Sequence, residues 1–450
     1  MAITSGAITY GPNATLKYNK AGAFTAGVEW PTTFSGTGGV IIANTGAITT
    51  NVVRVLNAGV PLTINSGATL TTGSTALMTL TVGGTTSVSG TLTLSSTAAK
   101  TFTGATTVNS GGTLLINGAS TGITFNDAVT INGTWNETSG ALVTFANNLT
   151  NNATSFTAVA GVHTFSGTGM TLSGTTATVI PSVAVTGTYT NNGTLTVNTA
   201  LSGAGGLTNS ATGTLNLGGT CSITTLANAG TINRTGTGTG TTTTALANFT
   251  NTGIINLGGL GAITGITNNA GGTVNLASSG TITAFNNATS TSTLYISALT
   301  VPTITTLTAT AAGNTVNYNG AGAQAVKANT YSNLTTSGSG VKTAGGVVTV
   351  NNLSVGLGTT FSTASTVNVG GDWSNNGTFT PVTSTVTFNG ALPQSIGGTS
   401  ATTFYNLTLD NAAGATLGRD TTVSNTLAFT NGKITTGANT LIIGSAGTAV

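Results

Sequence analysis

A phrase of seven residues recurs through the middle of the chain, and its spacing limits the possible folds more than any other feature. The phrase places an apolar residue at positions 195, 215, 232, 255 and 274, so its copies follow one another at uneven intervals of roughly 20 residues. These copies are Asn191–Val197, Ala211–Leu217, Asn228–Arg234, Asn251–Leu257 and Ala270–Leu276. A unit that repeats with one direction and one polarity at such intervals is typical of a solenoid, in which each repeat forms one coil.

Within each phrase, apolar and polar residues alternate. Leu195 and Val197 alternate with Thr194 and Thr196, and the same pattern occurs at 91–94 and 385–388. Such alternation predicts short, half-buried strands, whereas helical spacing and helix-favouring composition are almost absent. Glycine precedes many of these strands, as at Gly133, Gly193, Gly230, Gly253 and Gly377. We expect these glycines to adopt the positive φ of a sharp corner.

The composition agrees with stacked parallel coils. Charged residues make up only 3% of the chain, and Thr, Ser, Asn and 66 glycines supply most of the remaining polar and turn positions. Like charges repeated every ~4.8 Å would repel, whereas Thr, Asn and apolar residues can stack on their own kind. The hydrophobic fraction of 38% argues against disorder. We therefore predict an all-β, right-handed parallel β-helix of roughly 20 coils with almost no α-helix.

A longer unit appears near both ends of the sequence. Thr315–Ala321 recurs as Thr385–Ala391 after about 70 residues, and more weakly as Thr15–Ala21, each followed by a segment containing Gln or Phe. These patterns divide the predicted rod into N-terminal decorated coils (1–60), plain coils (61–313) and two units of ~70 residues (314–450). The apolar phrase at the end of the sequence suggests that the chain is part of a longer protein.

The C-terminal phrases Tyr405–Gly414, Thr422–Leu427 and Ile434–Leu441 resemble the repeats of very large secreted cell-surface proteins of Bacteroidota-type bacteria. The resemblance is best over residues 314–450 and looser over the first 60, while the middle of the chain is similar to filamentous-haemagglutinin-like and autotransporter-passenger adhesins. It implies a secreted β-helix, often exported by a type IX route with a C-terminal sorting domain. This sequence contains no such sorting domain.

Few residues could carry catalysis. His163 is the only histidine, and no acid or nucleophile is predicted beside it, so we expect a structural or surface role. Two carboxylates must converge for glycoside hydrolysis, but two candidate pairs are each ten residues apart, which matches neither one coil nor one strand face. These pairs are Asp127 with Glu137 and Asp410 with Asp420, and we interpret all four as solvated corner residues. Arg419–Asp420 is interpreted as a local ion pair or a corner.

Other sites are also disfavoured. The run Gly236–Gly240 lacks the Asp of calcium-binding repeats and the Lys-Ser/Thr of a phosphate loop. Between Arg234 and Lys327 no residue is charged, and no basic cluster with aromatic residues occurs, which argues against nucleic-acid binding. Cys221 is expected to be a small buried hydrophobe. We predict no catalytic residue, no cofactor and no metal.

The aromatic residues are expected in the core rather than on a binding face. Trp135 and Phe379 align with the inward Leu195, which predicts that both fill the interior. No apolar run approaches the length that a membrane-spanning helix requires. The N-terminal residues also lack the charged and apolar regions of a signal peptide.

The leading functional hypothesis is a non-enzymatic structural or adhesive protein of the bacterial cell surface. It would act as a secreted stalk or filament subunit that associates head to tail or joins neighbouring domains, with surface polysaccharide as a further partner. One alternative is a flat Thr face similar to ice-binding solenoids, based on the pairs 79/81, 91/93, 194/196 and 378/380. Asn at 216, 233, 256 and 275 interrupts that rank. The third hypothesis is a polysaccharide-active β-helix enzyme.

Overall fold

The computed structural model describes residues 8–74, 78–235, 249–259, 262–444 and 448–449. Over these residues the chain has 55% strand and no helix, and its parallel sheets stack as a β-solenoid of about 21 turns. The predicted parallel β-helix of roughly 20 coils is therefore confirmed. The glycine run 236–240 lies outside the described residues. The chain divides into two compact units, Met1–Asn233 and Arg234–Val450. The predicted boundaries at residues 60 and 313 stay a prediction.

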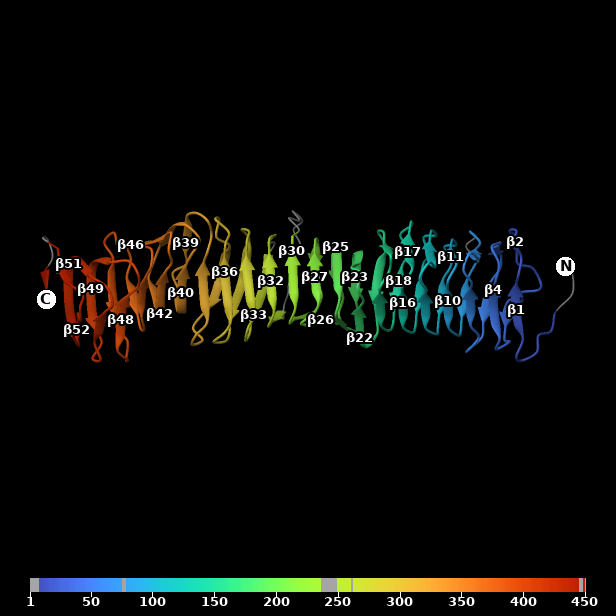
Figure 1. Ribbon diagram of the computed structural model, residues 1–450, viewed down its shortest axis with the longest axis horizontal. Helices are drawn as coiled ribbons and strands as arrows, with labels where there is room; N and C mark the ends of the chain where they lie inside the picture. Colours follow the sequence, from blue (N-terminus) through green and yellow to red (C-terminus); the bar gives the residue numbers. More distant parts are fainter. Residues whose placement is uncertain (1–7, 75–77, 236–248, 260–261, 445–447, 450) are drawn as a thin grey trace. The chain divides into compact units, whose positions relative to one another are not determined.

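The first unit has three walls of stacked parallel strands (Figure 1). Wall A contains β1 (Thr15–Tyr18), β4 (Gly39–Ile42), β7 (Leu62–Ile64), β10 (Thr86–Val88), β13 (Thr106–Val108), β16 (Val129–Ile131), β19 (Leu149–Asn151), β22 (Thr168–Ser173), β24 (Thr188–Asn191), β26 (Gly206–Asn209) and β29 (Thr225–Asn228). Wall B contains β2 (Phe24–Thr25), β5 (Ala47–Thr50), β8 (Thr69–Thr72), β11 (Thr91–Leu94), β14 (Thr113–Ile116), β17 (Thr134–Glu137) and β20 (Ser155–Thr157). Wall C contains β3 (Thr33–Phe34), β6 (Arg54–Leu56), β9 (Leu80–Val82), β12 (Lys100–Phe102), β15 (Ile123–Phe125), β18 (Val143–Phe145), β21 (Val162–Phe165), β23 (Thr178–Val185), β25 (Thr194–Ser202), β27 (Thr214–Leu217), β28 (Thr220–Cys221) and β30 (Thr231–Arg234).

The strands pair coil upon coil, as the repeated phrase predicts. Leu195 pairs with Leu215 and Val197 with Leu217 in a parallel register, so equivalent residues of two phrases stack directly. Each coil contributes one strand to each wall as far as β21. Beyond it, the long strands β23 and β25 take the place of two short strands, and wall B ends at β20.

The second unit is built from the same parallel pairings. One sheet contains β31 (Phe249–Asn251), β33 (Ala262–Asn268), β35 (Thr281–Asn287) and β37 (Thr303–Thr308), and another contains β39 (Gln324–Val326), β41 (Gly340–Ala344), β43 (Thr359–Thr363) and β46 (Thr378–Thr380). The longest sheet contains β32 (Ile254–Leu257), β34 (Thr273–Leu276), β36 (Thr293–Ile296), β38 (Thr315–Tyr318), β40 (Thr330–Thr336), β42 (Val348–Val355), β44 (Val367–Val369), β45 (Trp373–Asn375), β47 (Thr385–Phe388), β48 (Gln394–Gly397), β49 (Thr402–Asp410), β50 (Ala415–Leu417), β51 (Thr421–Asn431), β52 (Ile434–Thr435), β53 (Leu441–Ile443) and β54 (Thr448–Ala449).

The core lies between the walls and is filled by the inward residue of each alternating pair. Trp135 and Phe379 are buried, as predicted, and so is Cys221. Trp30 and Trp373, which lie outside the repeated phrase, are buried as well. The stack of aromatic residues supplies dispersion contacts that a narrow solenoid needs in place of a broad core.

The glycines before the strands serve a different purpose from the one predicted. Gly133, Gly230 and Gly377 are absent from the residues with positive φ, which instead include turn glycines such as Gly111 at 79°. A Cβ atom on Gly133 would lie 2.2 Å from the carbonyl oxygen of Gly112 in the preceding coil, and Gly230 and Gly377 would meet similar contacts. The prediction of positive φ is thus wrong at these positions, where glycine allows two backbones to approach closely.

Candidate functional site

Glu137 and His163 are the one carboxylate and basic side chain that lie within 4 Å of each other in the described part of the chain. Their Oε1 and Nε2 atoms lie 2.8 Å apart, and both side chains are 0% exposed. Glu137 stacks on Ile116 at an inward position of β17, and His163 stacks on Val143 in β21. The interpretation of Glu137 as a solvated corner residue is therefore wrong. The expectation that no acid lies beside His163 is also wrong, because the partner is 26 residues away in sequence.

The protein itself supplies the further hydrogen-bond partners of this pair. Trp135 Nε1 donates to Glu137 Oε1 at 2.8 Å, and the backbone N–H of Val159 donates to Oε2 at 3.2 Å. His163 Nδ1 lies 3.3 Å from the carbonyl oxygen of Gly161. General acid–base catalysis requires a group within hydrogen-bond reach of a substrate. Because neither side chain is exposed, the arrangement joins strands of adjacent coils and supports the structural role expected for His163.

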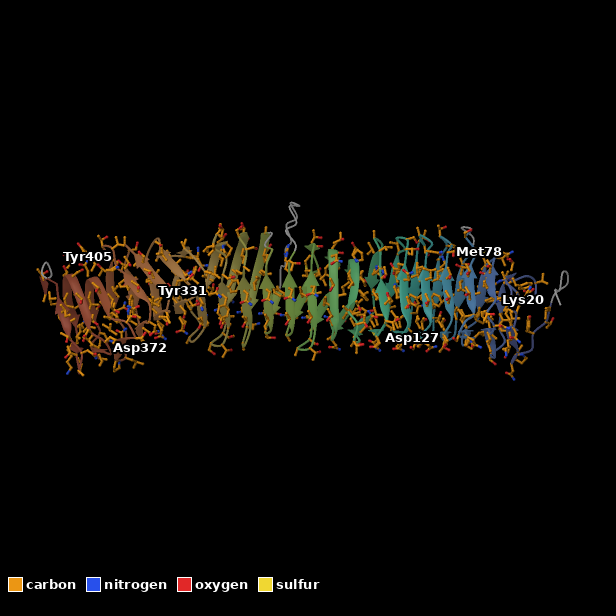
Figure 2. All side chains as sticks on the ribbon, turned by 45° about the horizontal axis from the view of Figure 1, so that its top comes forward. Lys20, Met78, Asp127, Tyr331, Asp372 and Tyr405 are labelled. Atoms are coloured by element: carbon orange, nitrogen blue, oxygen red, sulfur yellow. The ribbon has the colours of Figure 1, made fainter. Side chains whose placement is uncertain are left out.

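The other carboxylates lie where corners were expected. Asp127 is in the bend between β15 and β16 (Figure 2) and accepts hydrogen bonds from the N–H of Ala128 and the amide of Asn147. Asp420 is exposed and accepts from the N–H of Thr440 at 2.7 Å. Arg419 lies at the same corner and donates to the carbonyl oxygen of Gly398. These contacts stabilise turns and bring no second carboxylate close.

Asp410 is less exposed than Asp420. It is the last residue of β49, is half-buried, and its Oδ1 accepts a hydrogen bond from Asn431 Nδ2 at 2.6 Å. Asp410 and Asp420 each take a partner from the following coil rather than from one another. The structure thus brings together neither of the two carboxylate pairs considered from the sequence.

Two lysines occupy the interior, where no sequence pattern predicted them. Lys100 Nζ donates to the carbonyl oxygens of Ser96 and Ala98, and burial lowers its pKa to about 8. Lys342 Nζ donates to the carbonyl oxygens of Gly320 and Gly322 and to Gln324 Oε1, at 2.7–2.8 Å. Burial also lowers the pKa of Lys342. Both ammonium groups satisfy carbonyl groups that turn inward at a corner.

The longer repeat has a structural basis at the same kind of corner. In the sequence Asn-Gly-Ala-x-x-Gln, the side chains of Gln324 and Gln394 each accept the N–H of the glycine four residues earlier. Each Nε2 then donates to two carbonyl oxygens of the preceding coil. The repeated glutamine is therefore a buried corner cap.

Rows of buried asparagine form a further interior feature that sequence reasoning missed. Asn191 Nδ2 donates to Asn209 Oδ1, and Asn209 Nδ2 donates to Asn228 Oδ1, both at 2.8 Å. Asn191 is the last residue of β24, immediately before a corner, and is 1% exposed. In the second unit, Asn251, Asn268 and Asn287 form the same kind of row.

On the outside of the first unit, hydroxyl side chains form ranks. In wall C one rank contains five threonines in direct register, Thr81, Thr101, Thr124, Thr144 and Thr164. Walls A and B have ranks of their own, through Thr63, Ser87, Thr107, Thr130 and Thr150 and through Thr69, Thr91, Thr113 and Thr134. Parallel pairing places successive members ~4.8 Å apart.

Comparison with known proteins gives no further assignment. No protein-family model, no curated protein and no solved structure matches this chain. The resemblance to secreted repeat proteins therefore rests on the quoted sequence phrases alone.

Metal-ligating clusters and membrane-spanning helices are both absent from the described residues. No group of three or more His, Cys, Asp or Glu side chains in this part of the chain could hold a metal ion. The same residues form no helix long and apolar enough to cross a membrane. The side chains with perturbed pKa values include interior ones such as Tyr189, whose burial raises the pKa to about 12.

Proposed function

We propose that this chain is a non-enzymatic extracellular structural or adhesive protein that serves as a stalk or filament-forming segment. The main support is the interior, where polar groups of one coil are hydrogen-bonded to the next. Asn209, for example, contacts Asn191 in the preceding coil and Asn228 in the following one. Such ladders hold successive coils together by hydrogen bonds of the chain itself, which suits a protein whose task is mechanical.

The proposed assembly is end to end. A strand at the end of a solenoid has an unpaired edge, and a second copy or an adjoining domain can complete it. Within the described residues, β1 pairs with β4 alone, and in the proposed assembly the partner would pair with the other edge of β1. The proposed place of action is the bacterial cell surface, on the basis of the sequence resemblance, with surface polysaccharide as an adhesive partner.

Electron microscopy combined with limited proteolysis tests this proposal. Negatively stained material at rising concentration is expected to show end-to-end chains, and the coils are expected to survive a protease that degrades an unfolded control. Dispersed single particles at every concentration would contradict end-to-end assembly. Rapid cleavage within the paired strands would contradict the mechanical role.

The Thr ranks favour a second candidate, binding of an ordered ligand such as ice. The wall C rank is uniform over five coils, whereas the Asn interruptions noted in the sequence lie outside it. Thermal hysteresis of the intact chain is the measurement. Thr124→Lys in wall C should abolish it, while Thr130→Lys in wall A serves as the matched control. Absence of hysteresis in the unmodified chain would exclude this candidate.

The polysaccharide-active enzyme gains no comparable support. Glu137, one member of the first carboxylate pair, is buried against His163. Its counterpart Asp127 is engaged at a corner with Ala128 and Asn147. Glycosidic cleavage by two carboxylates would need both to face one sugar bond.

A further inference from the structure

Asparagine is followed directly by glycine at seven places in the sequence, and this is the dipeptide at which asparagine most readily loses its side-chain amide. Glycine has no Cβ atom, so its backbone nitrogen approaches the preceding side chain more easily than that of any other residue. The seven copies begin at Asn117, Asn132, Asn192, Asn319, Asn376, Asn389 and Asn431. In the folded chain, the surroundings of each copy decide whether the reaction occurs.

The reaction joins the backbone nitrogen of the glycine to Cγ of the asparagine. This new C–N bond closes a succinimide ring, and the side-chain nitrogen leaves as ammonia with the proton of the backbone nitrogen. Water then opens either of the two C–N bonds of the ring and gives aspartate or isoaspartate. In sum, water is consumed and ammonia is released, without oxidation or reduction. The side chain must therefore be able to turn toward the nitrogen, and the backbone must be able to bend.

Two of the seven copies lie within an identical tetrapeptide, Asn-Asn-Gly-Thr. These tetrapeptides are Asn191–Thr194 in the first unit and Asn375–Thr378 in the second. In both, the first asparagine is 1% exposed and the threonine begins a strand, β25 or β46. Since the local sequence is the same, a difference in reactivity between the two has to come from the tertiary structure.

The two reactive side chains differ in how firmly they are held. Asn376 is half-buried, its Oδ1 accepts the N–H of Thr399 at 2.9 Å, and its Nδ2 donates to the hydroxyl of Ser374 at 3.3 Å. Asn192 is exposed, and its side chain makes no hydrogen bond to any residue that the structure describes. The amide of Asn192 is therefore free to rotate, whereas that of Asn376 has to break two contacts.

The two glycines also differ in the space around their backbone. A Cβ atom on Gly377 would lie 2.3 Å from the carbonyl oxygen of Gly356 and 2.4 Å from that of Thr359, both in the preceding coil. On Gly193 the closest contact would be 3.3 Å, with the carbonyl oxygen of Gly174. The backbone of Gly193 therefore has room to move, while that of Gly377 is pressed against its neighbour.

The N–H groups of the two glycines do not explain this preference. The N–H of Gly193 donates to Asn191 Oδ1 at 3.3 Å, which is a long hydrogen bond within the same corner. The N–H of Gly377 has no acceptor in the part of the chain that the structure describes. The bond at Gly193 opposes the reaction, so the preference for Asn192 rests on its unrestrained side chain and on the space around Gly193.

We propose that Asn192 is a modification site, at which the folded chain spontaneously forms a succinimide and then aspartate and isoaspartate. The products carry a negative charge at the corner before β25, and isoaspartate also adds a backbone atom there. The hydrogen bond from Gly193 to Asn191 is lost, and Asn191 is the residue whose amide donates into the asparagine row of wall A. This modification is independent of the structural role proposed above, since the reaction requires no assembly of the chain.

Peptide mapping by mass spectrometry tests the proposal on the intact chain during incubation at mildly alkaline pH. The deamidated peptide with residue 192 is expected as two isomers that chromatography separates. Conversion at Asn192 should be at least about fivefold faster than at Asn376, whose hydrogen bonds have to open first. Equal rates at the two residues, or faster conversion at Asn376, would overturn the proposal.

The same incubation in urea is the control for the local sequence. Once the chain is unfolded, the two identical tetrapeptides are expected to react at similar rates, because neither is held by a neighbouring coil. A preference for Asn192 that stayed the same in urea would overturn the role of the fold.

Gly193→Ala tests the attack by the backbone nitrogen. Gly193 is absent from the residues with positive φ, and the added methyl group would meet its closest neighbour at 3.3 Å, so we expect the coil to be retained. Conversion at Asn192 should slow about tenfold or more, because the methyl group hinders the approach of the nitrogen, while Asn376 keeps its rate. An unchanged rate at Asn192 in the folded variant would contradict the mechanism. If the variant does not fold, the comparison of Asn192 with Asn376 in the unmodified chain decides.

Discussion

Two stretches of the first unit fill the same solenoid interior by different means. Between residues 100 and 165, wall C stacks Phe102, Phe125, Phe145 and Phe165 with ring centroids 4.9, 5.6 and 5.4 Å apart. Between residues 188 and 228, wall A stacks asparagines linked by amide hydrogen bonds of 2.8 Å. In these two rows like side chains stack on like, whereas elsewhere an inward polar residue follows an apolar one, as Glu137 follows Ile116. The comparison teaches that an interior position accepts an apolar or a polar side chain, provided that a neighbouring coil supplies a matching contact.

The physical reason lies in the geometry of parallel strands. Residues in register are ~4.8 Å apart, so each inward side chain mainly contacts its own equivalents. An aromatic ring gains stacking contacts from another ring, and an amide gains a donor and an acceptor from another amide. Replacing one member of a row therefore removes contacts to two coils.

The pair Glu137–His163 lies beside the aromatic row, within the same stretch of residues, and gives the largest expected effect. Glu137→Ala leaves the imidazole of His163 and Nε1 of Trp135 without their buried partner. We expect a loss of about 3–5 kcal/mol in the free energy of unfolding, which urea denaturation followed by Trp fluorescence would measure. The control is the double variant Glu137→Leu with His163→Leu, which should lose clearly less because neither charge nor imidazole stays buried alone. If Glu137→Ala lost no more free energy of unfolding than the double variant, the structural importance of the pair would be contradicted.

Phe145→Ala tests the aromatic row. The ring of Phe145 stacks on Phe125 and Phe165 and also contacts Trp135, so its removal opens a cavity against two coils. The expected loss is about 3–4 kcal/mol, measured by the same denaturation experiment. Phe145→Leu should cost about half as much, since most of the volume is kept. Phe145→Asn should cost more than Phe145→Leu, because its amide would lie between two aromatic rings without a polar partner. Equal losses of the free energy of unfolding for these two variants would contradict this expectation.

Asn209→Ala tests the amide row. Asn209 Nδ2 lies within hydrogen-bond distance of the carbonyl oxygens of Gly213 and Thr231 and of Asn228 Oδ1, and Asn209 Oδ1 accepts from Asn191, so the change removes contacts to both neighbouring coils. We expect a loss of about 2–3 kcal/mol. Asn216→Ala is the matched control, because Asn216 lies on the outer face, where water can replace its bond to Thr196. Equal losses for the two variants would show that burial of the row adds nothing.

The smallest effect concerns pH and Lys100. Burial holds the pKa of Lys100 at about 8 in the folded chain, below its value of 10.5 in the unfolded chain. Between these values the unfolded chain binds more protons, so the free energy of unfolding should rise with pH by about 1–2 kcal/mol. Urea midpoints from pH 7.5 to 10 would measure the rise, and Lys100→Met should reduce it. A flat profile in the unmodified chain would contradict the prediction.

Above pH 10 the tyrosines oppose this trend. The pKa of Tyr189 is raised to about 12 by burial, so the folded chain keeps a proton that the unfolded chain loses. The free energy of unfolding should therefore fall as the pH rises past 10. The measurement for Lys100 ends at pH 10 for this reason.

The sequence alone determined the parallel β-helix, its repeat of one coil per phrase and the inward direction of residues such as Trp135 and Leu195. These features follow from alternation along one strand and from repetition of one phrase, both of which are visible in the sequence. The prediction that Cys221 is buried, which rested on the hydrophobic residues around it, is also confirmed. The sequence misplaced Glu137, because a rule that sends polar residues outward or to corners takes no account of partners in other coils.

Only the tertiary structure decided which residues meet between coils. Glu137 contacts His163 at a sequence separation of 26 and Lys342 contacts Gln324 at a separation of 18, so the two contacts share no common period. Corners of variable length change these separations, so a fixed period cannot predict a single contact. The cost of burying a polar group depends on whether that contact exists, and in this solenoid the contacts come from the neighbouring coil.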